Sequence, residues 1–415
     1  MKTKKKKKWI KWRHKLITAL VRPLFSLWAK LKYGFKKGDF DDSKKRQYLI
    51  ISNHQTAFDQ FFVGLMFKRP LYYVASEDLF AKGILSKLLT FAVAPIPIKK
   101  SMTDIRAVMT MLKVRNEGGS IAIFPEGNRT FSGKTGFIKP SIVSLIKTLK
   151  LPLVIMNIQG GYGTQPRWAD KTRKGKTYIS VKTVVEAEDF LKLSDEDLYD
   201  MIKENLYVSE GRPTGNYPGK NRAEYLDRAM YVCPYCGLSR FYAKGDHITC
   251  TTCNRTVLYG EDKVLKGVGF DFPFEYVEGW YDYQTEFLNG LKIKDYLTAP
   301  MWDERVCLYD VVDGKKRVVI EKNSNVLLFS DRYEFTVGDE RLVFPFDGIT
   351  AVTVLGRNKV DVYKDGKIYQ LKGDKHFNGL IFTNVYYHYL NETKGDNYDK
   401  SLDKFDGRIG KFLGL

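Results

Sequence analysis

The stretch that decides the fold is Tyr48-Leu-Ile-Ile-Ser-Asn-His54-Gln-Thr-Ala-Phe-Asp59. Its short apolar run with two adjacent isoleucines predicts a buried strand over 48–52, and the chain then turns into a helix near 57–67. His54 follows the strand directly, and Asp59 comes five residues later. On a regular helix this spacing places two side chains about 140° apart, so the turn between them is what would let Asp59 fold back onto the His54 ring.

The pair of His54 and Asp59 is suited to proton transfer. A carboxylate that accepts the proton of one ring nitrogen fixes the tautomer of the imidazole, and the other nitrogen is then able to take a proton from a substrate. The alternative is a surface histidine and a helix-start aspartate that do not interact, because a His-x4-Asp spacing alone is a weak signal.

Two further apolar runs also end in polar residues. Ser120-Ile-Ala-Ile-Phe-Pro-Glu126-Gly127-Asn-Arg129-Thr130 predicts a strand followed by a turn, and Val93–Lys100 predicts a strand that ends in the paired cations Lys99 and Lys100. Gly127 allows the backbone to approach a ligand closely, and Arg129 offers a planar fork for phosphate. Three strands that each end in such residues predict an α/β fold with the residues along one edge of its sheet, where ligands bind.

Four blocks of the sequence resemble the glycerolipid acyltransferases, the family of 1-acylglycerol-3-phosphate acyltransferases. Asn53-His54-x4-Asp59 is similar to the catalytic motif of that family, and Phe124–Thr130 is similar to its acceptor-binding motif. Ile96–Lys100 resembles the intermediate motif, and Leu151–Met156 resembles the fourth block. All four occur in the order of the family between Tyr48 and Gln159, and together they are specific although each one alone is not.

The resemblance implies a mixed sheet flanked by helices and an acyl transfer from acyl-CoA or acyl-carrier protein to a lysophospholipid hydroxyl. It implies that His54 is the base and that Asp59 orients it. It also implies that Glu126, Gly127 and Arg129 bind the glycerol phosphate of the acceptor, with charge added by Lys100 and Lys99. Arg is usual in the family where Lys100 stands, and Lys binds phosphate as a point charge without the two-pronged geometry of Arg.

The remaining α/β region is predicted from short apolar runs and helical periodicity. Strands are expected near 71–75, 93–98, 120–124, 152–158 and 177–185, and helices near 102–116, 140–150 and 194–206, the last capped by Ser194. The glycines of Gly160-Gly-Tyr-Gly163 could cradle phosphate or form a plain turn. Residues 208–222, rich in Gly, Pro and Asn, indicate a domain boundary.

The positive charge of the chain is concentrated at its start. The net charge is +20, but residues 1–38 hold 14 of the 68 Lys and Arg and no Asp or Glu, so the rest of the chain has a net charge of only +6. No apolar run reaches the roughly 20 residues that span a bilayer, and Arg22-Pro23 interrupts the apolar stretch. We expect one broken or two short amphipathic helices over 9–36 that anchor the protein in the membrane interface. The alternatives are a signal peptide, which would need a small-residue cleavage site, and a disordered basic tail.

Four of the five cysteines form two close pairs, Cys233-Pro-Tyr-Cys236 and Cys250-Thr-Thr-Cys253. Two Cys-x2-Cys knuckles joined by a short hairpin are typical of a structural zinc site with four thiolate ligands. A rubredoxin-like iron site and a pair of disulfides are the alternatives. His247 lies near the knuckles but is not needed as a ligand, and Cys307 is expected to be a small buried residue.

The C-terminal third is predicted to be mainly β. Alternation over 270–276 suggests a strand, and turn signals recur at 313–314, 323–325, 338–339, 347–348, 356–357 and 365–366, which favours a small antiparallel sheet or barrel. Phe377, Ile381, Val385 and Tyr389 then recur every four residues along one helix face. Strands followed by one closing helix resemble a pleckstrin-homology or GRAM-type module in pattern only.

The sequence thus predicts four parts and one main function. The parts are a membrane-anchoring segment (1–40), an acyltransferase domain (41–225), a zinc ribbon (226–264) and a mainly β domain (265–415). The main hypothesis is a peripheral or monotopic acyltransferase on the cytoplasmic face of a membrane, which makes phosphatidate from 1-acylglycerol 3-phosphate. Its alternatives are another lysolipid or glycerol 3-phosphate as acceptor, a non-catalytic lipid-binding adaptor, and a nucleic-acid-binding protein based on the basic terminus and the ribbon.

Overall fold

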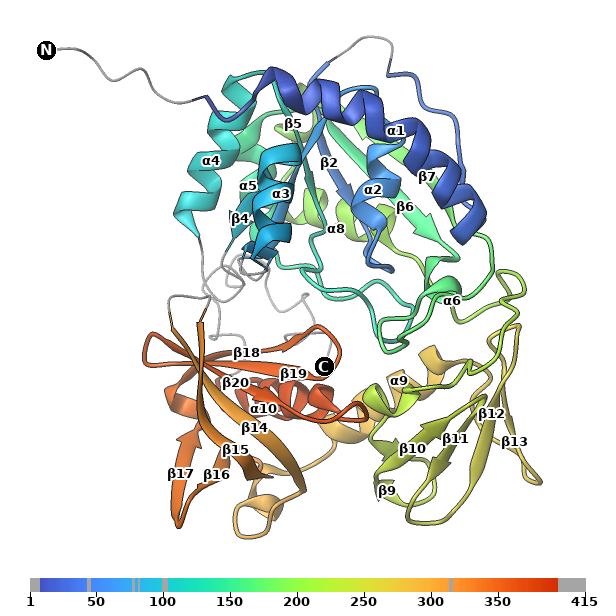
Figure 1. The fold of residues 1–415 in the computed structure, drawn as a ribbon, viewed down its shortest axis with the longest axis vertical. Helices are drawn as coiled ribbons and strands as arrows, with labels where there is room; N and C mark the ends of the chain where they lie inside the picture. Colours follow the sequence, from blue (N-terminus) through green and yellow to red (C-terminus); the bar gives the residue numbers. More distant parts are fainter. Residues whose placement is uncertain are drawn as a thin grey trace, which may run out of the picture. The chain divides into compact units, whose positions relative to one another are not determined.

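The computed structural model describes residues 8–42, 46–76, 79–80, 83–98, 104–312 and 316–394 of the 415 residues. The described residues form two compact units, and the chain passes between them several times (Figure 1). Unit 1 is drawn from Met1–Arg129, Ile138–Gly161 and Lys176–Val208, and unit 2 from Thr130–Phe137, Tyr162–Gly175 and Ser209–Leu415. Three segments of the region expected to be the acyltransferase domain, 130–137, 162–175 and 209–225, therefore belong to unit 2.

Unit 1 is built on a seven-stranded sheet in the order β1-β7-β6-β2-β5-β3-β4. Five of its strands run parallel: β2 (Leu49–Ser52), β3 (Leu71–Ser76), β4 (Ile96–Ile98), β5 (Ser120–Ile123) and β6 (Leu153–Gln159). The strand β7 (Tyr178–Val185) is antiparallel to β6, and β1 (Lys36–Lys37) pairs with β7 in parallel. The predicted mixed α/β sheet is confirmed, with Leu49 of the central strand between Ile121 and Leu153.

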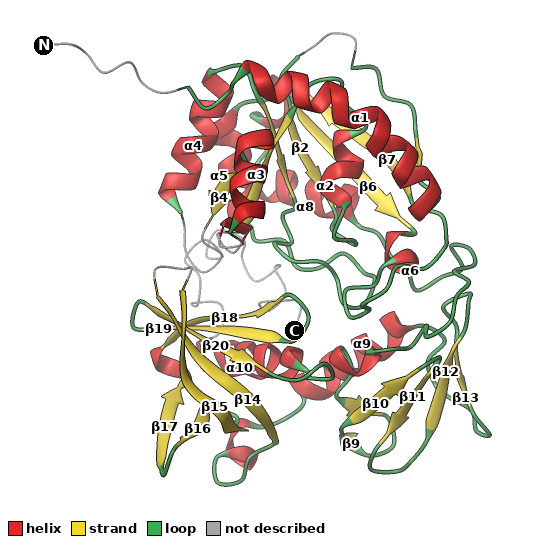
Figure 2. Ribbon diagram, viewed as in Figure 1, coloured by secondary structure: helices red, strands yellow, loops and turns green. Residues whose placement is uncertain are grey.

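Helices cover both faces of this sheet, so its central strands are buried on both sides (Figures 1 and 2). The first two helices, α1 (Trp12–Tyr33) and α2 (Asp59–Gly64), share an apolar core with β2 and β6 that includes Tyr33 and Phe62. The remaining helices of the unit are α3 (Ile84–Val93), α4 (Ile105–Asn116), α5 (Ser141–Leu149), α7 (Ala187–Phe190) and α8 (Asp195–Leu206). As predicted, Ser194 caps α8 by accepting the N–H of Asp197.

The first helix corrects one prediction. Residues 12–33 form a single helix that runs through Arg22-Pro23 rather than two short ones. Proline removes one intrahelical hydrogen bond, but Arg22 adds contacts on the body of the unit because its guanidinium donates to the carbonyls of Leu65 and Phe67. The helix α3 was not predicted, since the sequence analysis expected only a strand beginning at Val93.

Unit 2 contains the cysteine knuckles and the C-terminal sheet in one apolar core. The first part comprises the short turn η2 (Leu226–Arg228), the pair β8 (Val232–Cys233) and β9 (Gly237–Leu238), and an antiparallel sheet of β10 (Phe241–Lys244), β11 (His247–Cys250), β12 (Thr256–Tyr259) and β13 (Leu265–Gly267). Phe131 and Trp168, from the segments 130–137 and 162–175, lie in the same core.

The second part of unit 2 is a curled antiparallel sheet in the order β17-β16-β15-β14-β20-β19-β18, closed by one helix (Figure 2). Its elements are β14 (Trp302–Val312), β15 (Lys316–Leu328), β16 (Arg332–Val337), β17 (Glu340–Pro345), β18 (Ile349–Leu355), β19 (Lys359–Lys364), β20 (Lys367–Lys372) and α10 (Gly379–Lys394), with the short turns η3 (Ile293–Tyr296) and η4 (Phe346–Gly348). The predicted helix is confirmed from Gly379 on, with Ile381 and Val385 buried and Tyr389 half-buried on one face, whereas Phe377 is buried two residues before the helix begins.

Two local predictions in unit 2 were wrong, and one falls outside the described residues. Residues 323–325 continue β15 instead of turning, since Asn325 pairs with Arg305 across the ladder. The strand expected over 270–276 is replaced by irregular chain that leads into the helix α9 (Val277–Asn289). The turn expected at 313–314 and the tail beyond residue 394 lie outside the described residues.

Candidate active site

The parallel strands of unit 1 bring two predicted segments, the residues after β2 and those after β5, to one edge of the sheet. His54 follows the end of β2 by two residues, and the turn 124–127 follows the end of β5, which is paired directly with β2. Lys99 and Lys100 follow the end of β4 but lie outside the described residues. The carboxyl ends of parallel strands share an edge, so the shared position of these segments follows from the topology.

His54 and Asp59 contact one another as predicted. The distance from Nδ1 of His54 to Oδ2 of Asp59 is 2.8 Å. The His54 side chain is 19% exposed, while Asp59 is fully buried at the first position of α2. A carboxylate at Nδ1 makes that nitrogen the protonated one in the neutral ring, so Nε2 is the nitrogen that can act as a base.

The Asp59 carboxylate is held by the loop between β2 and α2. Its Oδ2 also accepts the backbone N–H groups of Gln55 and Thr56, at 2.6 and 2.8 Å, and its Oδ1 accepts the Thr56 hydroxyl at 2.5 Å. These local hydrogen bonds close the sharp turn that was predicted between His54 and Asp59. They also satisfy the buried carboxylate, whose charge would otherwise destabilise the fold. The orientation of the His54 ring therefore depends on a carboxylate that has itself been fixed by the backbone.

The segment 124–130, predicted to bind the acceptor, contacts the segment 53–59, predicted to be catalytic, through two side chains. Oε1 of Glu126 accepts the backbone N–H of His54 at 2.6 Å. The ring of Phe124 stacks on the His54 ring with centroids 4.4 Å apart and planes 23° apart. Sequence reasoning missed both contacts, because it placed Glu126 only at the acceptor and gave Phe124 no role. A carboxylate that binds the main chain of His54 positions the base, whatever else it contacts.

Close packing fixes the loop after β2 from the side of β6. The side-chain amide of Asn53 donates to the Ile158 carbonyl at 2.9 Å, and its oxygen accepts the Ile158 N–H at 2.7 Å. A Cβ atom at Gly161 would lie 2.9 Å from Gln55 Oε1 and from Thr56 Cγ2, so only glycine fits there. Gly161, the first residue of the short helix α6 (Gly161–Thr164), thus lets the backbone lie close to the loop after β2.

The turn that carries the other predicted acceptor residues is well defined. The N–H of Gly127 donates to the Phe124 carbonyl at 3.0 Å, and Gly127 has a φ of 68°, in the left-handed region that favours glycine. Arg129 comes two residues later, partly exposed at the end of the motif. Gly127 and Arg129 thus lie on the chain that follows β5, as the sequence predicted.

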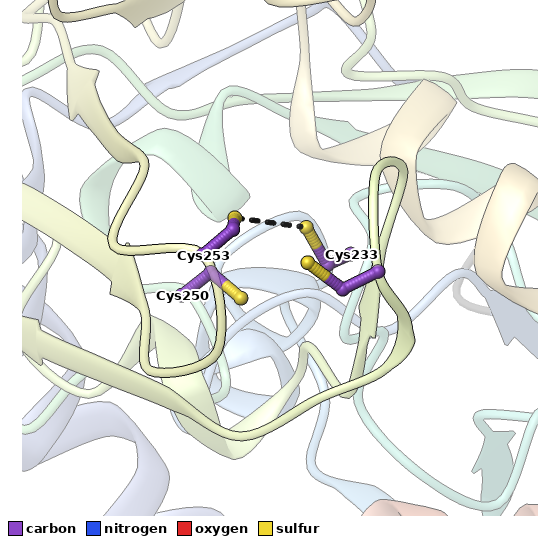
Figure 3. A group of neighbouring side chains, drawn as sticks. Cys233, Cys250 and Cys253 are labelled. Atoms are coloured by element: carbon purple, nitrogen blue, oxygen red, sulfur yellow. Dashed lines mark hydrogen bonds between the residues drawn. The ribbon is translucent and has the colours of Figure 1, made fainter.

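The four paired cysteines of unit 2 form a separate cluster (Figure 3). The Sγ atoms of Cys233, Cys236, Cys250 and Cys253 all lie within 4.8 Å of one another, and those of Cys233 and Cys253 are 3.9 Å apart. Tetrahedral zinc with Zn–S bonds of about 2.3 Å requires sulfurs about 3.8 Å apart. Disulfides are contradicted, since all four cysteines are free. The donor set therefore fits a tetrahedral metal ion.

The electrostatic surroundings of the cluster differ between its two knuckles. Burial raises the pKa of the Cys233 thiol to about 12. Burial also acts to raise the pKa of Cys253, but hydrogen bonds from the backbone and side chain of Arg255 outweigh it and lower that pKa to about 6. The thiolate is the form that binds metal, so Cys253 is the ligand already ionised near neutral pH.

Comparisons with known proteins show similarity to acyltransferases over the first part of the chain. Residues 36–159 match the family model described as Acyltransferase. The chain is 28% identical over 148 residues to a protein named probable 1-acyl-sn-glycerol-3-phosphate acyltransferase from Mycoplasma genitalium, covering 34% of this chain and 54% of that protein. It is also 28% identical over 186 residues to 1-acyl-sn-glycerol-3-phosphate acyltransferase from Limnanthes alba, covering 41% of this chain and 63% of that protein.

A solved structure is also similar. The crystal structure of the 1-acyl-sn-glycerophosphate acyltransferase from Thermotoga maritima covers 46% of this chain and 78% of that one, with a TM-score of 0.38 and 18% identity. The chain spans about 54 to 63% of the length of the two curated relatives. The match to the Acyltransferase family model over 36–159 includes every predicted site residue except the four cysteines.

Proposed function

We propose that the protein is a membrane-associated O-acyltransferase that moves a fatty acyl group from acyl-CoA or acyl-carrier protein to the hydroxyl of a lysophospholipid. The acceptor we favour is 1-acylglycerol 3-phosphate, and the product is then phosphatidate for phospholipid biosynthesis. The observation that carries the proposal is the 2.8 Å contact between His54 and Asp59 at the sheet edge that also presents the acceptor-binding motif. The names of the curated relatives support the choice of acceptor.

The chemistry needs one base and no covalent intermediate on the protein. Nε2 of His54 takes the proton of the acceptor hydroxyl as its oxygen attacks the thioester carbonyl carbon. Asp59 keeps the ring oriented and stabilises the imidazolium that forms. When the carbon–sulfur bond breaks, the imidazolium returns the proton to the leaving thiolate, so an ester and a free thiol are the products.

The acceptor is held by its phosphate in this proposal. Gly127 offers close backbone approach and Arg129 offers a planar fork for phosphate oxygens. Lys100, with Lys99, adds positive charge for the phosphate in this proposal, as the family resemblance implies. Glu126 stays a proposed acceptor-binding residue, and its carboxylate also positions His54 by accepting the N–H of that residue.

The first helix supports attachment to a membrane. Six apolar residues of α1 are exposed at spacings of three and four, so they form one stripe along the helix: Trp12, Leu16, Leu20, Leu24, Leu27 and Leu31. None of the helices in the described part of the chain combines the length and apolarity that crossing a bilayer requires. We therefore propose that α1 lies in the interface of a cytoplasmic leaflet, where anionic lipids attract the basic N-terminal residues.

The cysteine cluster supports a structural zinc ion. Cys233, Cys236, Cys250 and Cys253 would hold it, and four protein ligands leave no position for substrate. When bound, the metal supplies folding free energy to unit 2 rather than a reaction step. The fit of the donor set is geometric and applies to iron as well as zinc, so metal analysis of the purified protein distinguishes the two.

The test of the proposed reaction is thiol release from acyl-CoA in the presence of vesicles that contain lysophosphatidate. We expect His54→Ala to lower turnover by about 10²–10⁴, the usual contribution of a general base. His247→Ala is the matched control, because it removes an exposed histidine of unit 2. Turnover that persists in His54→Ala would remove this residue from the mechanism, and mass spectrometry of products from mixed lysolipids identifies the acceptor.

A further inference from the structure

The helix α3 exposes an apolar face that none of the described residues of unit 1 covers. Ile84 is 85% exposed, Leu88 61% and Phe91 54%. These residues are separated by four and three positions, so they lie on one side of the helix. Lys87 is the single charged residue between Ile84 and Val93. Contiguous exposed apolar residues of this size are uncommon on soluble proteins and mark a contact with another apolar surface.

This face is tied to the start of α1. Nε of Arg13 donates to the Phe91 carbonyl at 2.9 Å, and the guanidinium lies 4.3 Å from the centroid of the Phe91 ring. The indole N–H of Trp9 donates to the Ala94 carbonyl at 3.0 Å. The backbone N–H groups of Trp9 and Ile10 both donate to the Glu117 carboxylate. These contacts place the end of α3 beside the end of α1 from which the exposed stripe of α1 begins.

The topology also places α3 near the candidate active site. The helix carries the chain from β3 to the parallel strand β4, so it begins at the edge where the parallel strands end. His54 lies at that same edge. The end of α3 that carries Ile84 is therefore on the active-site side of the sheet, and the end that carries Phe91 is beside α1 (Figure 1).

We propose that α3 is a second membrane-contacting helix, whose Ile84, Leu88 and Phe91 enter the boundary between headgroups and acyl chains beside α1. The charge of the neighbouring segment favours a bilayer rather than a second protein as the surface that this face contacts. Residues 1–38 hold 14 basic and no acidic residues, and this positive charge complements an anionic lipid surface. This inference rests on the proposed membrane association and extends it, because it brings lipid to the active-site edge. An acceptor confined to the bilayer then needs only a short path to His54.

The test measures binding without any acyl donor, so its outcome does not depend on catalysis. The double variant Ile84→Ser/Leu88→Ser and the control variant Leu191→Ser are sedimented with vesicles of phosphatidylcholine and about one-third phosphatidylglycerol. Leu191 is an exposed leucine of unit 1 outside α1 and α3. We expect the double variant to lose about tenfold or more in partition coefficient, because two large apolar side chains no longer leave water, and the control to bind like the native protein.

Two results would overturn the proposal. One is equal vesicle binding by the double variant and the native protein. The other is a dimer of the native protein that the double variant abolishes in light scattering, which would assign the face to a second copy of the chain. Because the substituted side chains are exposed, thermal unfolding should not change and confirms that the variant is folded. Unchanged turnover of the double variant in detergent micelles would separate this inference from the proposed reaction.

Discussion

Replacement of Asp59 by asparagine tests the role of the carboxylate because the surrounding donors dictate how the amide must sit. Oδ2 of Asp59 accepts three hydrogen bonds, from Nδ1 of His54 and the N–H groups of Gln55 and Thr56, whereas Oδ1 accepts only the Thr56 hydroxyl. An amide nitrogen in the place of Oδ2 would face three donors. The amide oxygen therefore takes that place, and the Thr56 hydroxyl can rotate to accept from the amide nitrogen.

The expected magnitude follows from this orientation. The His54 tautomer is kept in Asp59→Asn, so the roughly 10⁴-fold loss that a wrong tautomer causes in serine proteases should not appear. What is lost is the charge that stabilises the imidazolium, worth up to about 4 kcal/mol for charges about 4 Å apart at an effective dielectric constant of about 20. We expect kcat to fall about 10²–10³-fold. Stability should fall by about 1–3 kcal/mol, because the four charge-assisted hydrogen bonds of the carboxylate become neutral ones.

The assay compares Asp59→Asn with His54→Ala in thiol release and in urea unfolding. His54→Ala should lose more activity and less stability, since the His54 side chain is partly exposed and Asp59 is not. Wild-type kcat in Asp59→Asn would refute any part for the carboxylate in catalysis. A loss equal to that of His54→Ala would instead show that the amide nitrogen faces the imidazole, which contradicts the hydrogen-bond argument for its orientation.

Three further predictions concern other parts of the molecule. Glu126→Ala should lower kcat about tenfold with little change in the KM of the donor, because His54 loses the contact on its N–H; a change in acceptor KM alone would contradict this positioning role. Chelation or Cys250→Ser should lower the melting temperature, with the loss of amide protection confined to unit 2, and metal analysis should give one zinc per chain. Burial lowers the pKa of His14, so the unfolded state binds a proton more readily than the folded state. The free energy of unfolding should therefore fall as pH drops below about 6.5. His14→Gln should flatten this dependence in urea titrations at several pH values.

The α/β core could be predicted from the sequence because its signals are local. Short apolar runs predicted β2 to β7 of unit 1 to within a few residues, though not β1, and the parallel pairing of β2 with β5 places His54 and the turn 124–127 at one edge. The contact between His54 and Asp59 was predictable for the same reason, since only five residues and one turn separate them. The role of the Glu126 carboxylate was not, because its partner is a backbone N–H 72 residues away whose direction no periodicity encodes.

The helices at the surface were harder to predict, for two physical reasons. Pro23 reads as a helix breaker, but one lost hydrogen bond is small beside the packing of Ala29 and Tyr33 against the body of unit 1. In α3 the apolar residues do not face the core, so their helical spacing could not be distinguished from that of a buried strand or loop. Apolar residues usually predict burial in the protein, but apolar residues that face a membrane are exposed on the surface of the protein.

The helix α9 was not predicted because the positions that face the core hold a polar residue as well as apolar ones. Its buried residues are Val277, Trp280, Gln284 and Leu288, at helical spacing, but a glutamine stands at one of them. The glutamine is there for its hydrogen bonds: Oε1 of Gln284 accepts the N–H groups of Tyr231 and Val232, and the indole N–H of Trp280 donates to the Val232 carbonyl. A buried amide that satisfies backbone groups just before Cys233 is invisible to a pattern based on apolarity.

The helix α9 also contacts a segment that lies far earlier in the sequence. Asp282 pairs with Nζ of Lys134 at 2.6 Å, five residues after Arg129 of the acceptor-binding motif. The segment 130–137 and the residues that lead into Cys233 are thus fixed by one element of unit 2, although about 100 residues separate them in sequence. The predicted division into a separate acyltransferase domain and ribbon stays a prediction, but α9 gives the four-cysteine site and the continuation of the acceptor-binding motif a common support. Ordering of one should therefore promote ordering of the other.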